Sequence, residues 1–159
     1  MKYINAFDFD LLNGASQMPN IPLRVRNLVK RLDSSDPIMI AKKLNITIIY
    51  GKTPEKVNGF WRRILRRKYI GVNEDITEEW EQKAVIAHEL GHIFLHPGYA
   101  SYCIAGRTYL SNSHKEGEAD QFSAELLSFH CNVEKEYILD FLKNGWNLPK
   151  GTVLKQAVF

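Results

Sequence analysis

The 159-residue chain contains little cysteine and no long hydrophobic run. Its two cysteines, Cys103 and Cys131, are too few for the disulfide framework of a small secreted domain, so we expect both to be free thiols. The longest apolar stretches fall far short of the roughly 20 residues that span a bilayer, and no basic segment followed by an apolar one lies near Met1. These absences predict a cytoplasmic protein that is neither embedded in a membrane nor exported.

The chain also has little net charge and no repeats. A formal net charge of +3 is too small to indicate nucleic-acid binding by itself, and no internal repeat or low-complexity segment is present. The hydrophobic (45%) and charged (25%) fractions are those of an ordinary globular protein, and 159 residues suffice for one domain but hardly for two. We therefore expect a single domain over residues 1–159, with an irregular N-terminal arm over about residues 1–22.

Helix and strand signals alternate along the chain and predict an α+β fold. Asp36-Pro37 is a typical helix start, Thr77 is placed to cap a long helix, and Pro97-Gly98 is placed to stop it. The β-branched run "ITIIY" and the stretch "NGFWRRILRRKYIGVN" predict strands. In chain order, we expect helices over 23–32 and 36–44, a strand at 46–50, two strands within 58–73, a helix over 77–96, a loop over 99–114, and helices over 115–129 and 133–143.

Three of the five histidines lie in "AVIAHELGHIFLHPG" (84–98), spaced four residues apart. At about 100° per residue, His88 and His92 lie roughly 40° apart and one turn from each other, with Glu89 between them. This is H-E-x-x-H, the zinc-peptidase signature, in which two imidazoles bind the metal and the glutamate is the general base for a zinc-activated water. The alternatives are a pH-sensitive surface and a chance pattern on a solvated face. A hydrophobic stripe beside the histidines favours the metal site; its members are Ile86, Leu90, Ile93 and Phe94.

The third histidine of this helix, His96, does not fit as a ligand. It lies two turns from His88, about 12 Å along the helix axis, which is too far for both to reach one ion without strain. The longer motif H-E-x-x-H-x-x-G-x-x-H also fails, because Leu95 and Gly98 occupy its last two defined positions. We expect His96 to be a helix-end residue, favoured by the negative end of the dipole. Gly91 keeps one side of the helix slim, which suits a strand or a substrate passing close.

A second segment, "HKEGEADQFSAELL" (114–127), offers a third ligand. On a helix, Glu116 and Asp120 lie about 40° apart and share a side, whereas Glu118 lies about 200° from Glu116. We interpret Glu116 as the third zinc ligand and Asp120 as the acceptor for the free imidazole N–H of His88 or His92. The alternative is an ordinary acidic first turn of a helix, and this is how we interpret Glu118.

With both segments in view, the chain resembles the ImmA/IrrE family of metallopeptidases. The resemblance rests on "AVIAHELGHIFLH" (84–96) and on "EGEADQFSAELL" (116–127), which matches the family segment E-x-x-A-[DN]-x-F-[AS], and it extends over about 37–129. It implies a minimal zincin-like (gluzincin-like) α+β domain with a small sheet packed on helices that include the H-E-x-x-H helix. It also implies zinc as cofactor and cleavage of regulatory proteins. ImmA-like members act on a helix-turn-helix repressor encoded nearby on a mobile element or prophage. One departure is "LLSFH" (126–130), where the family often has a proline after the two leucines.

We therefore expect a zinc metallo-endopeptidase with His88, His92 and Glu116 as metal ligands and Glu89 as the general base. A donor for the developing oxyanion is also needed. The sequence does not choose among four candidates from the 99–114 loop, which are Tyr99, Tyr102, Tyr109 and His114. The competing hypothesis is an antirepressor-type module that sequesters a regulator without proteolysis. Glu89 argues against it, because a purely structural zinc site does not need a base.

The basic run "RRILRRK" (62–68), flanked by Trp61 and Tyr69, is the remaining feature. It could contact phosphates, but such runs more often form a solvated or edge-protecting face of a β-ribbon, so we do not expect direct nucleic-acid binding. We expect an open edge of the two strands in 58–73 to hold an extended substrate peptide beside the histidine helix. Because side chains alternate along a strand, only about half of the flanking arginines would face one substrate. These candidates for substrate docking are Arg62, Arg63, Arg66 and Arg67.

Overall fold

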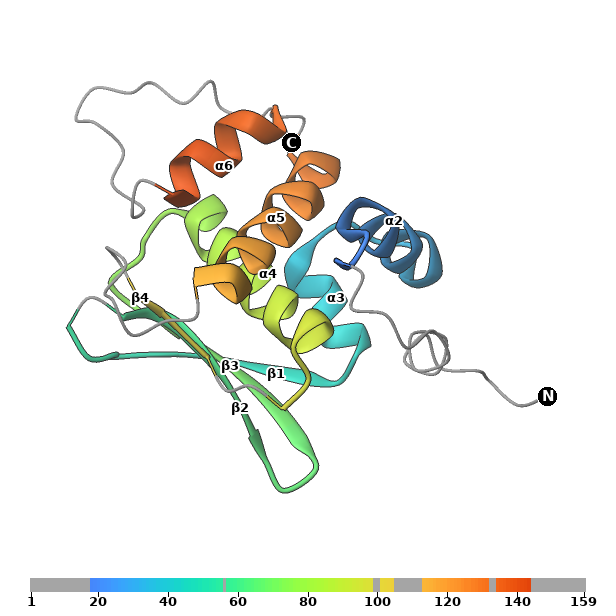
Figure 1. Cartoon of the computed structure of the whole chain (residues 1–159). Coiled ribbons are helices and arrows are strands. Elements are labelled where there is room, and N and C mark those ends of the chain that lie inside the picture. Colours follow the sequence, from blue (N-terminus) through green and yellow to red (C-terminus); the bar gives the residue numbers. More distant parts are fainter. Residues whose placement is uncertain (1–17, 56, 99–100, 105–112, 132–133, 144–159) are drawn as a thin grey trace.

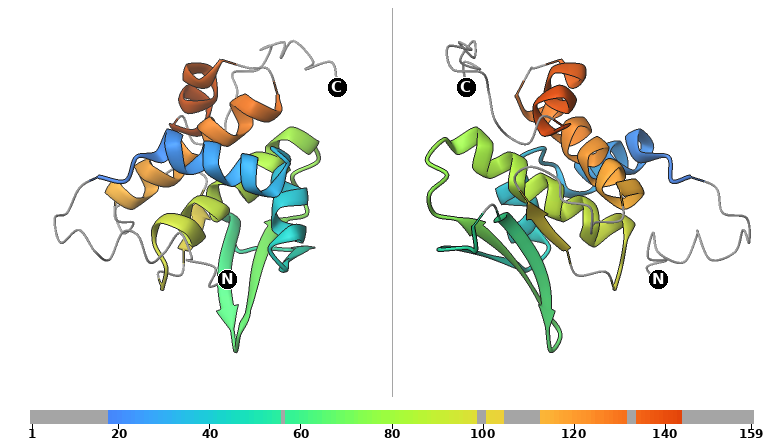
Figure 2. Two further views of the ribbon diagram at one scale, coloured as in Figure 1. Left: turned by 90° about the vertical axis from the view of Figure 1, so that its right-hand side faces the viewer. Right: turned by 60° about the vertical axis from the view of Figure 1, so that its left-hand side comes forward.

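A computed structural model describes residues 18–55, 57–98, 101–104, 113–131 and 134–143, and confirms the α+β prediction. The described helices all lie on one side of a small sheet, as Figures 1 and 2 show. In chain order the described elements are α2 (Ile21–Leu32), α3 (Pro37–Lys43), β1 (Ile46–Gly51), β2 (Val57–Ile64), β3 (Arg67–Asn73), α4 (Glu79–Leu95), β4 (Ser101–Ile104), α5 (Ser113–His130) and α6 (Lys135–Lys143).

Side-chain caps start two of the three helices α2, α3 and α4, and one of the two caps expected from the sequence is observed. At α3 the side chain of Asp36 accepts a 2.9 Å hydrogen bond from the Ile38 backbone N–H, as predicted. At α2 the cap is Asn20, whose side chain accepts from the Leu23 N–H at 3.1 Å, so the helix begins at Ile21, two residues before its expected start at Leu23. At α4 the N-cap is Glu78 rather than Thr77, and Glu78 makes no side-chain cap hydrogen bond. The first turn of α4 is instead favoured by its acidic side chains.

The sheet has the strand order β1-β3-β2-β4. β1 pairs parallel to β3, β2 and β3 form an antiparallel hairpin, and β4 pairs antiparallel to β2. The two strands expected within 58–73 are therefore inner strands over most of their length, so the expectation of an open edge on them is wrong there; the edge strands are β1 and β4. β4 also corrects the expected loop over 99–114. Four residues are too short to show a period of their own, and it is pairing with β2 that defines this strand.

The histidine helix α4 is the central helix of the domain. Every residue from Lys83 to Ile93 is buried, because α4 packs against the sheet on one side and against α5 on the other (Figure 2). Gly59 on β2 permits the sheet contact, since a Cβ there would lie 2.3 Å from Val85 Cγ1. Of the described helices, none is long and apolar enough to cross a membrane.

Gly91 sets the approach of α4 to α5. A Cβ at this position would lie 3.1 Å from both Ala119 Cα and Phe122 Cβ. The expectation that Gly91 makes room for a strand or substrate is therefore wrong, because the neighbour that passes close is α5. This contact matters for the site, since α5 carries Glu116 and Asp120 toward the histidines of α4.

Gly91→Val is expected to destabilise the protein by about 1–3 kcal/mol, because added methyl groups overpack the contact with α5. Gly117→Ala is the matched control: nothing lies within 4 Å of a Cβ at Gly117, so this change should stabilise α5 by about 0.5–1 kcal/mol. Urea unfolding of both variants measures the difference. Equal effects of the two substitutions would contradict the close helix packing.

Candidate metal centre

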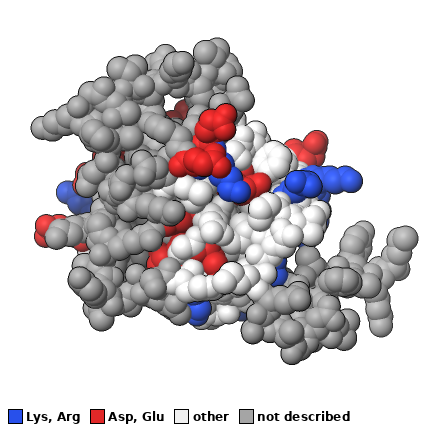
Figure 3. Space-filling view, turned by 45° about the horizontal axis from the view of Figure 1, so that its top comes forward, with Lys and Arg blue, Asp and Glu red and all other residues white. Residues whose placement is uncertain are grey.

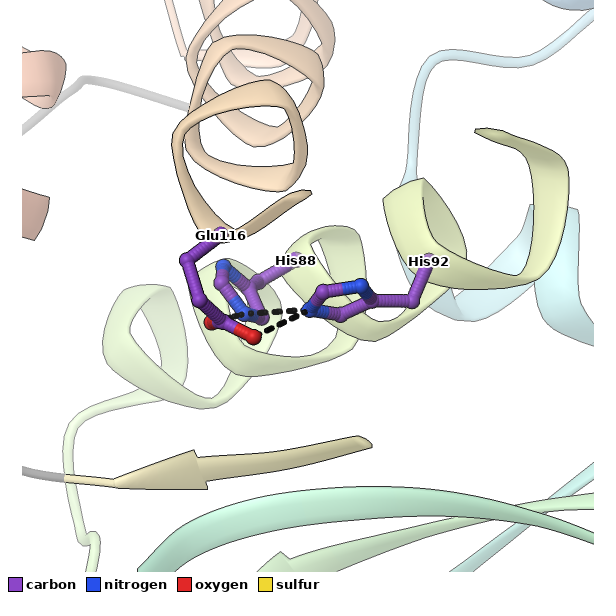
Figure 4. Close-up of side chains that lie close together, drawn as sticks. All are labelled: His88, His92 and Glu116. Atoms are coloured by element: carbon purple, nitrogen blue, oxygen red, sulfur yellow. Dashed lines mark hydrogen bonds and ion pairs between the residues drawn. The ribbon is translucent and has the colours of Figure 1, made fainter. Parts of the chain in front are cut away.

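Three buried side chains bring ligand atoms together where α4 meets α5 (Figure 4). His88 Nε2 lies 3.1 Å from His92 Nε2 and 3.2 Å from Glu116 Oε2, and His92 Nε2 lies 3.3 Å from Glu116 Oε1. Both imidazoles come from consecutive turns of α4, and the carboxylate reaches them from the first turns of α5. The structure therefore brings together the three residues that the sequence singled out as ligands.

The separations match those of a tetrahedral zinc site. With zinc–ligand bonds of about 2.0–2.1 Å, tetrahedral geometry puts neighbouring ligand atoms about 3.3–3.4 Å apart. The three separations in the cluster, 3.1–3.3 Å, lie close to this value, with a different oxygen of the Glu116 carboxylate facing each imidazole. Two nitrogens and one oxygen are also the ligand set that zinc accepts in catalytic sites, where a fourth position stays open. The residues present thus fit a zinc ion.

Asp120 contacts the imidazole of His88 at Nδ1, the ring nitrogen that faces away from the cluster. Its Oδ1 lies 3.0 Å from His88 Nδ1, and both side chains are almost fully buried. If Nδ1 carries the proton and donates it to Asp120, then Nε2 keeps its lone pair toward the cluster. The sequence left open whether Asp120 contacts His88 or His92, and the structure places it on His88.

Burial and hydrogen bonding keep the cluster in the protonation state that binds metal. Burial alone would raise the pKa of Glu116, but the close contacts of its carboxylate with the rings of His88 and His92 outweigh it and hold this pKa far below its usual value. Burial lowers the pKa of His92, which favours the neutral imidazole. An ionised carboxylate and a neutral imidazole are the forms that bind a metal ion.

Glu89 lies beside the cluster on α4 and has no exposed surface. It follows His88 directly in the sequence, so it leaves the helix about 100° round from that ligand. A carboxylate is buried only at a high free-energy cost unless its surroundings stabilise it. Glu89 therefore does not lie on a solvated helix face, which was the alternative for this motif.

His96 has a structural role that the sequence did not reveal. Its Nε2 lies 3.2 Å from Glu118 Oε2 and 3.3 Å from the carbonyl oxygen of Lys115. His96 is the residue that ends α4, as expected, but it also ties this end to the first turns of α5, next to Glu116. Glu118 is correspondingly held by His96 and lies 3.6 Å from His114 Nδ1, rather than acting as an ordinary solvated acidic residue. In the sequence, the only hint of a role for His96 was that it follows His92 at the same spacing of four residues that separates His92 from His88.

Among the remaining candidates, those whose side chains the structure describes are exposed and are not part of the cluster. His114 is exposed and contacts Glu118, while Tyr99 and Tyr109 lie outside the described residues. Tyr102 pairs with Phe60 in the sheet, and its side chain lies outside the described part of the chain. No oxyanion donor is therefore assigned. The docking candidates Arg62, Arg63, Arg66 and Arg67 are all exposed on the β2–β3 hairpin.

The metal-free protein is expected to lose stability as the pH falls below about 6.5. Burial lowers the pKa values of His92, His96 and His130 from 6.5, so the unfolded chain binds protons in this range that the folded chain does not. The free energy of unfolding therefore decreases as the pH drops through this value. Thermal unfolding of chelator-treated protein at pH values of about 7.5 and 5.5 measures the effect. A melting temperature that is higher at the lower pH would contradict it.

Two comparisons with known proteins agree with this geometry. A peptidase family model described as "IrrE N-terminal-like domain" matches residues 41–147, which include α4, α5 and the whole cluster. The chain is 35% identical over 107 residues to "Uncharacterized immunity region protein 2" of Bacillus phage phi105, in an alignment that covers 67% of each protein. No solved structure matches. Because the family match covers more than half of the chain and both motif helices, the chain belongs to the peptidase family of the IrrE N-terminal-like domain.

Proposed function

We propose that this protein is a cytoplasmic zinc-dependent endopeptidase that cleaves a helix-turn-helix repressor of a mobile element or prophage. The observation that carries the proposal is the buried cluster of His88, His92 and Glu116, whose ligand atoms lie 3.1–3.3 Å apart. Membership in a peptidase family supports the reaction type, and a relative named for a phage immunity region supports a repressor as substrate.

Each residue of the centre has a defined task in this proposal. His88, His92 and Glu116 hold the zinc ion, and Asp120 keeps His88 in the required tautomer and orientation. A bound zinc ion supplies Lewis acidity, which polarises a peptide carbonyl and makes water acidic near neutral pH. Glu89 accepts the proton of the attacking water and then passes it to the leaving amine. The burial of Glu89 keeps bulk water from competing for this proton.

The free edge of β4 is where we propose that the substrate backbone binds. β4 is an edge strand of the described sheet, follows α4 in the chain and packs against it. An extended peptide can add to such an edge through backbone hydrogen bonds, which hold a scissile amide straight without demanding a particular sequence. This replaces the expectation that an edge of the strands in 58–73 holds the peptide.

Cleavage of the neighbouring regulator tests the proposal. The purified protein is incubated with the helix-turn-helix repressor encoded beside its gene, with and without a chelator, and the products are analysed by mass spectrometry. We expect one or a few defined cuts that stop with chelator and return when zinc is restored. Intact repressor in every condition would contradict the proposed substrate.

A further inference from the structure

The tip of the β2–β3 hairpin extends beyond both of its neighbouring strands. Pairing of β4 with β2 ends at Trp61, opposite Ser101, and pairing of β1 with β3 starts at Lys68, opposite Ile46. Arg62 and Arg63 therefore extend beyond β4, and residues 64–67 extend beyond both β4 and β1 as a two-stranded tip. We call residues 62–67 the ribbon. Figures 1 and 2 show it projecting away from the helices, at the end of the sheet where α4 ends.

Three of the four arginines of the ribbon carry positive charge that no described residue neutralises through an ion pair. All four arginines are exposed, and the sequence from Val57 to Asn73 contains no aspartate or glutamate. Arg63, Arg66 and Arg67 form no ion pair with any described residue. By contrast, the face of the molecule in Figure 3 shows acidic and basic side chains side by side. The mild positive charge of the whole chain thus has a local concentration at the ribbon.

Large apolar side chains sit at the same tip. Leu65 is 92% exposed and Ile64 is 57% exposed. Leu65 also has φ 56°, in the left-handed region that branched side chains rarely adopt and that glycine would occupy without strain. An exposed leucine in this conformation adds nothing to the stability of the chain itself. Strain combined with exposure is a combination expected of a side chain that a binding partner covers.

We propose that the ribbon is a docking site for the protein substrate, which would present an apolar pocket bordered by acidic residues. This inference rests on the proposed function and names the surface that selects the substrate. Protein interfaces concentrate binding energy in a central apolar anchor and in arginines that bind carboxylates through two hydrogen bonds. Leu65 with Ile64 would supply the anchor, and the arginines around them would supply the charged rim.

Two observations favour a protein over a nucleic acid as the occupant. Phosphate groups would engage the arginines but leave the two aliphatic side chains of the tip without an apolar partner, and it is Leu65 that is strained. The ribbon also begins where β4 begins, since Trp61 of β2 lies opposite Ser101. A substrate strand added along the β4 edge would therefore bring the adjoining folded part of the substrate toward the ribbon.

The test compares a protein substrate with a short one. The probes are the repressor encoded beside the gene and a synthetic peptide that spans its cleavage site. Arg66→Glu/Arg67→Glu and Leu65→Gly should each lower kcat/KM for the repressor about ten-fold or more, the size of one interface hot spot, and leave kcat/KM for the peptide unchanged. Leu65→Gly should also keep or raise the melting temperature, because glycine removes the strain. The effect of the arginine variant should shrink at high salt.

Arg26→Glu/Lys52→Glu is the matched control, since it changes the net charge equally at exposed positions on α2 and in the loop after β1. It should leave cleavage of both probes unchanged. Equal cleavage of the repressor by wild type and by both ribbon variants would overturn the docking site but not the peptidase. Ribbon-dependent binding of the repressor without any cleavage would support docking and reject the peptidase. Ribbon-dependent binding to a DNA duplex or to anionic vesicles, with none to the repressor, would overturn the proposal in favour of that ligand.

Discussion

Glu89→Gln is expected to reduce repressor cleavage by about 10²–10⁴-fold while the fold and the bound zinc remain. Glutamine has nearly the same shape as glutamate and keeps its place in the buried surroundings of α4, but it does not accept a proton at neutral pH. Only the proton-transfer step is therefore removed. Cleavage rate, zinc content and melting temperature of the purified variant measure the three properties separately.

The same variant separates a catalyst from a protein that acts by sequestration. In cells that carry a reporter under the repressor, Glu89→Gln should no longer relieve repression. Full relief of repression by this variant would show that binding of the regulator is sufficient, and the antirepressor hypothesis would then be the better description. Loss of zinc together with cleavage would instead show that Glu89 supports the site structurally.

Replacing any one of His88, His92 and Glu116 with alanine is expected to remove most of the bound zinc and with it all cleavage. Each change deletes one of three ligand atoms that lie within 4.8 Å of one another in a buried site, and two remaining ligands hold zinc only weakly. Zinc content after dialysis and affinity by competition with a chelating dye give the measurements.

Substitutions at two residues near the ligands should affect zinc binding less than loss of a ligand does. Asp120→Asn should weaken zinc affinity by about 10–100-fold, because it disturbs the partner of His88 rather than a ligand. Glu118→Ala is the control on α5: its carboxylate contacts His96 and His114, so bound zinc should persist. Equal zinc loss in Glu118→Ala and Glu116→Ala would contradict the assignment of Glu116 as the ligand.

The sequence predicts those parts of the site that depend on helix periodicity. His88 and His92 share a face of α4, and Glu116 and Asp120 share a face of α5, so the angular positions along each helix already identified the four side chains that meet in the structure. The α+β class and the capping of α3 by Asp36 follow from local chemistry in the same way.

Features that depend on contacts between distant segments were not predictable. The strand β4 exists because it pairs with β2, and four residues carry no period that could identify it. His96 looked like a simple helix end, since its partner Glu118 lies on another helix. Gly91 shows the same limit: a glycine in a helix indicates a close neighbour, but only the fold shows that this neighbour is α5.

The arginine-rich run had several interpretations until its register was known. Arg62 and Arg63 lie where β2 and β3 still share a sheet with β1, whereas Arg66 and Arg67 lie at the two-stranded tip beyond β1 and β4. This distinction requires the positions where β1 and β4 stop pairing. The exposed, left-handed Leu65 gave no signal in the sequence, because a leucine between arginines is equally compatible with a buried strand residue.

Zinc-dependent hydrolysis at the cluster of His88, His92 and Glu116 is tested most directly by titrating metal-free protein with zinc while recording bound metal and repressor cleavage together. We expect the cleavage rate to rise in proportion to occupancy and to saturate at about one zinc ion per chain, as expected for three protein ligands and one open position. Cleavage by the metal-free protein, or full occupancy without cleavage of the repressor or of any peptide, would contradict a zinc endopeptidase.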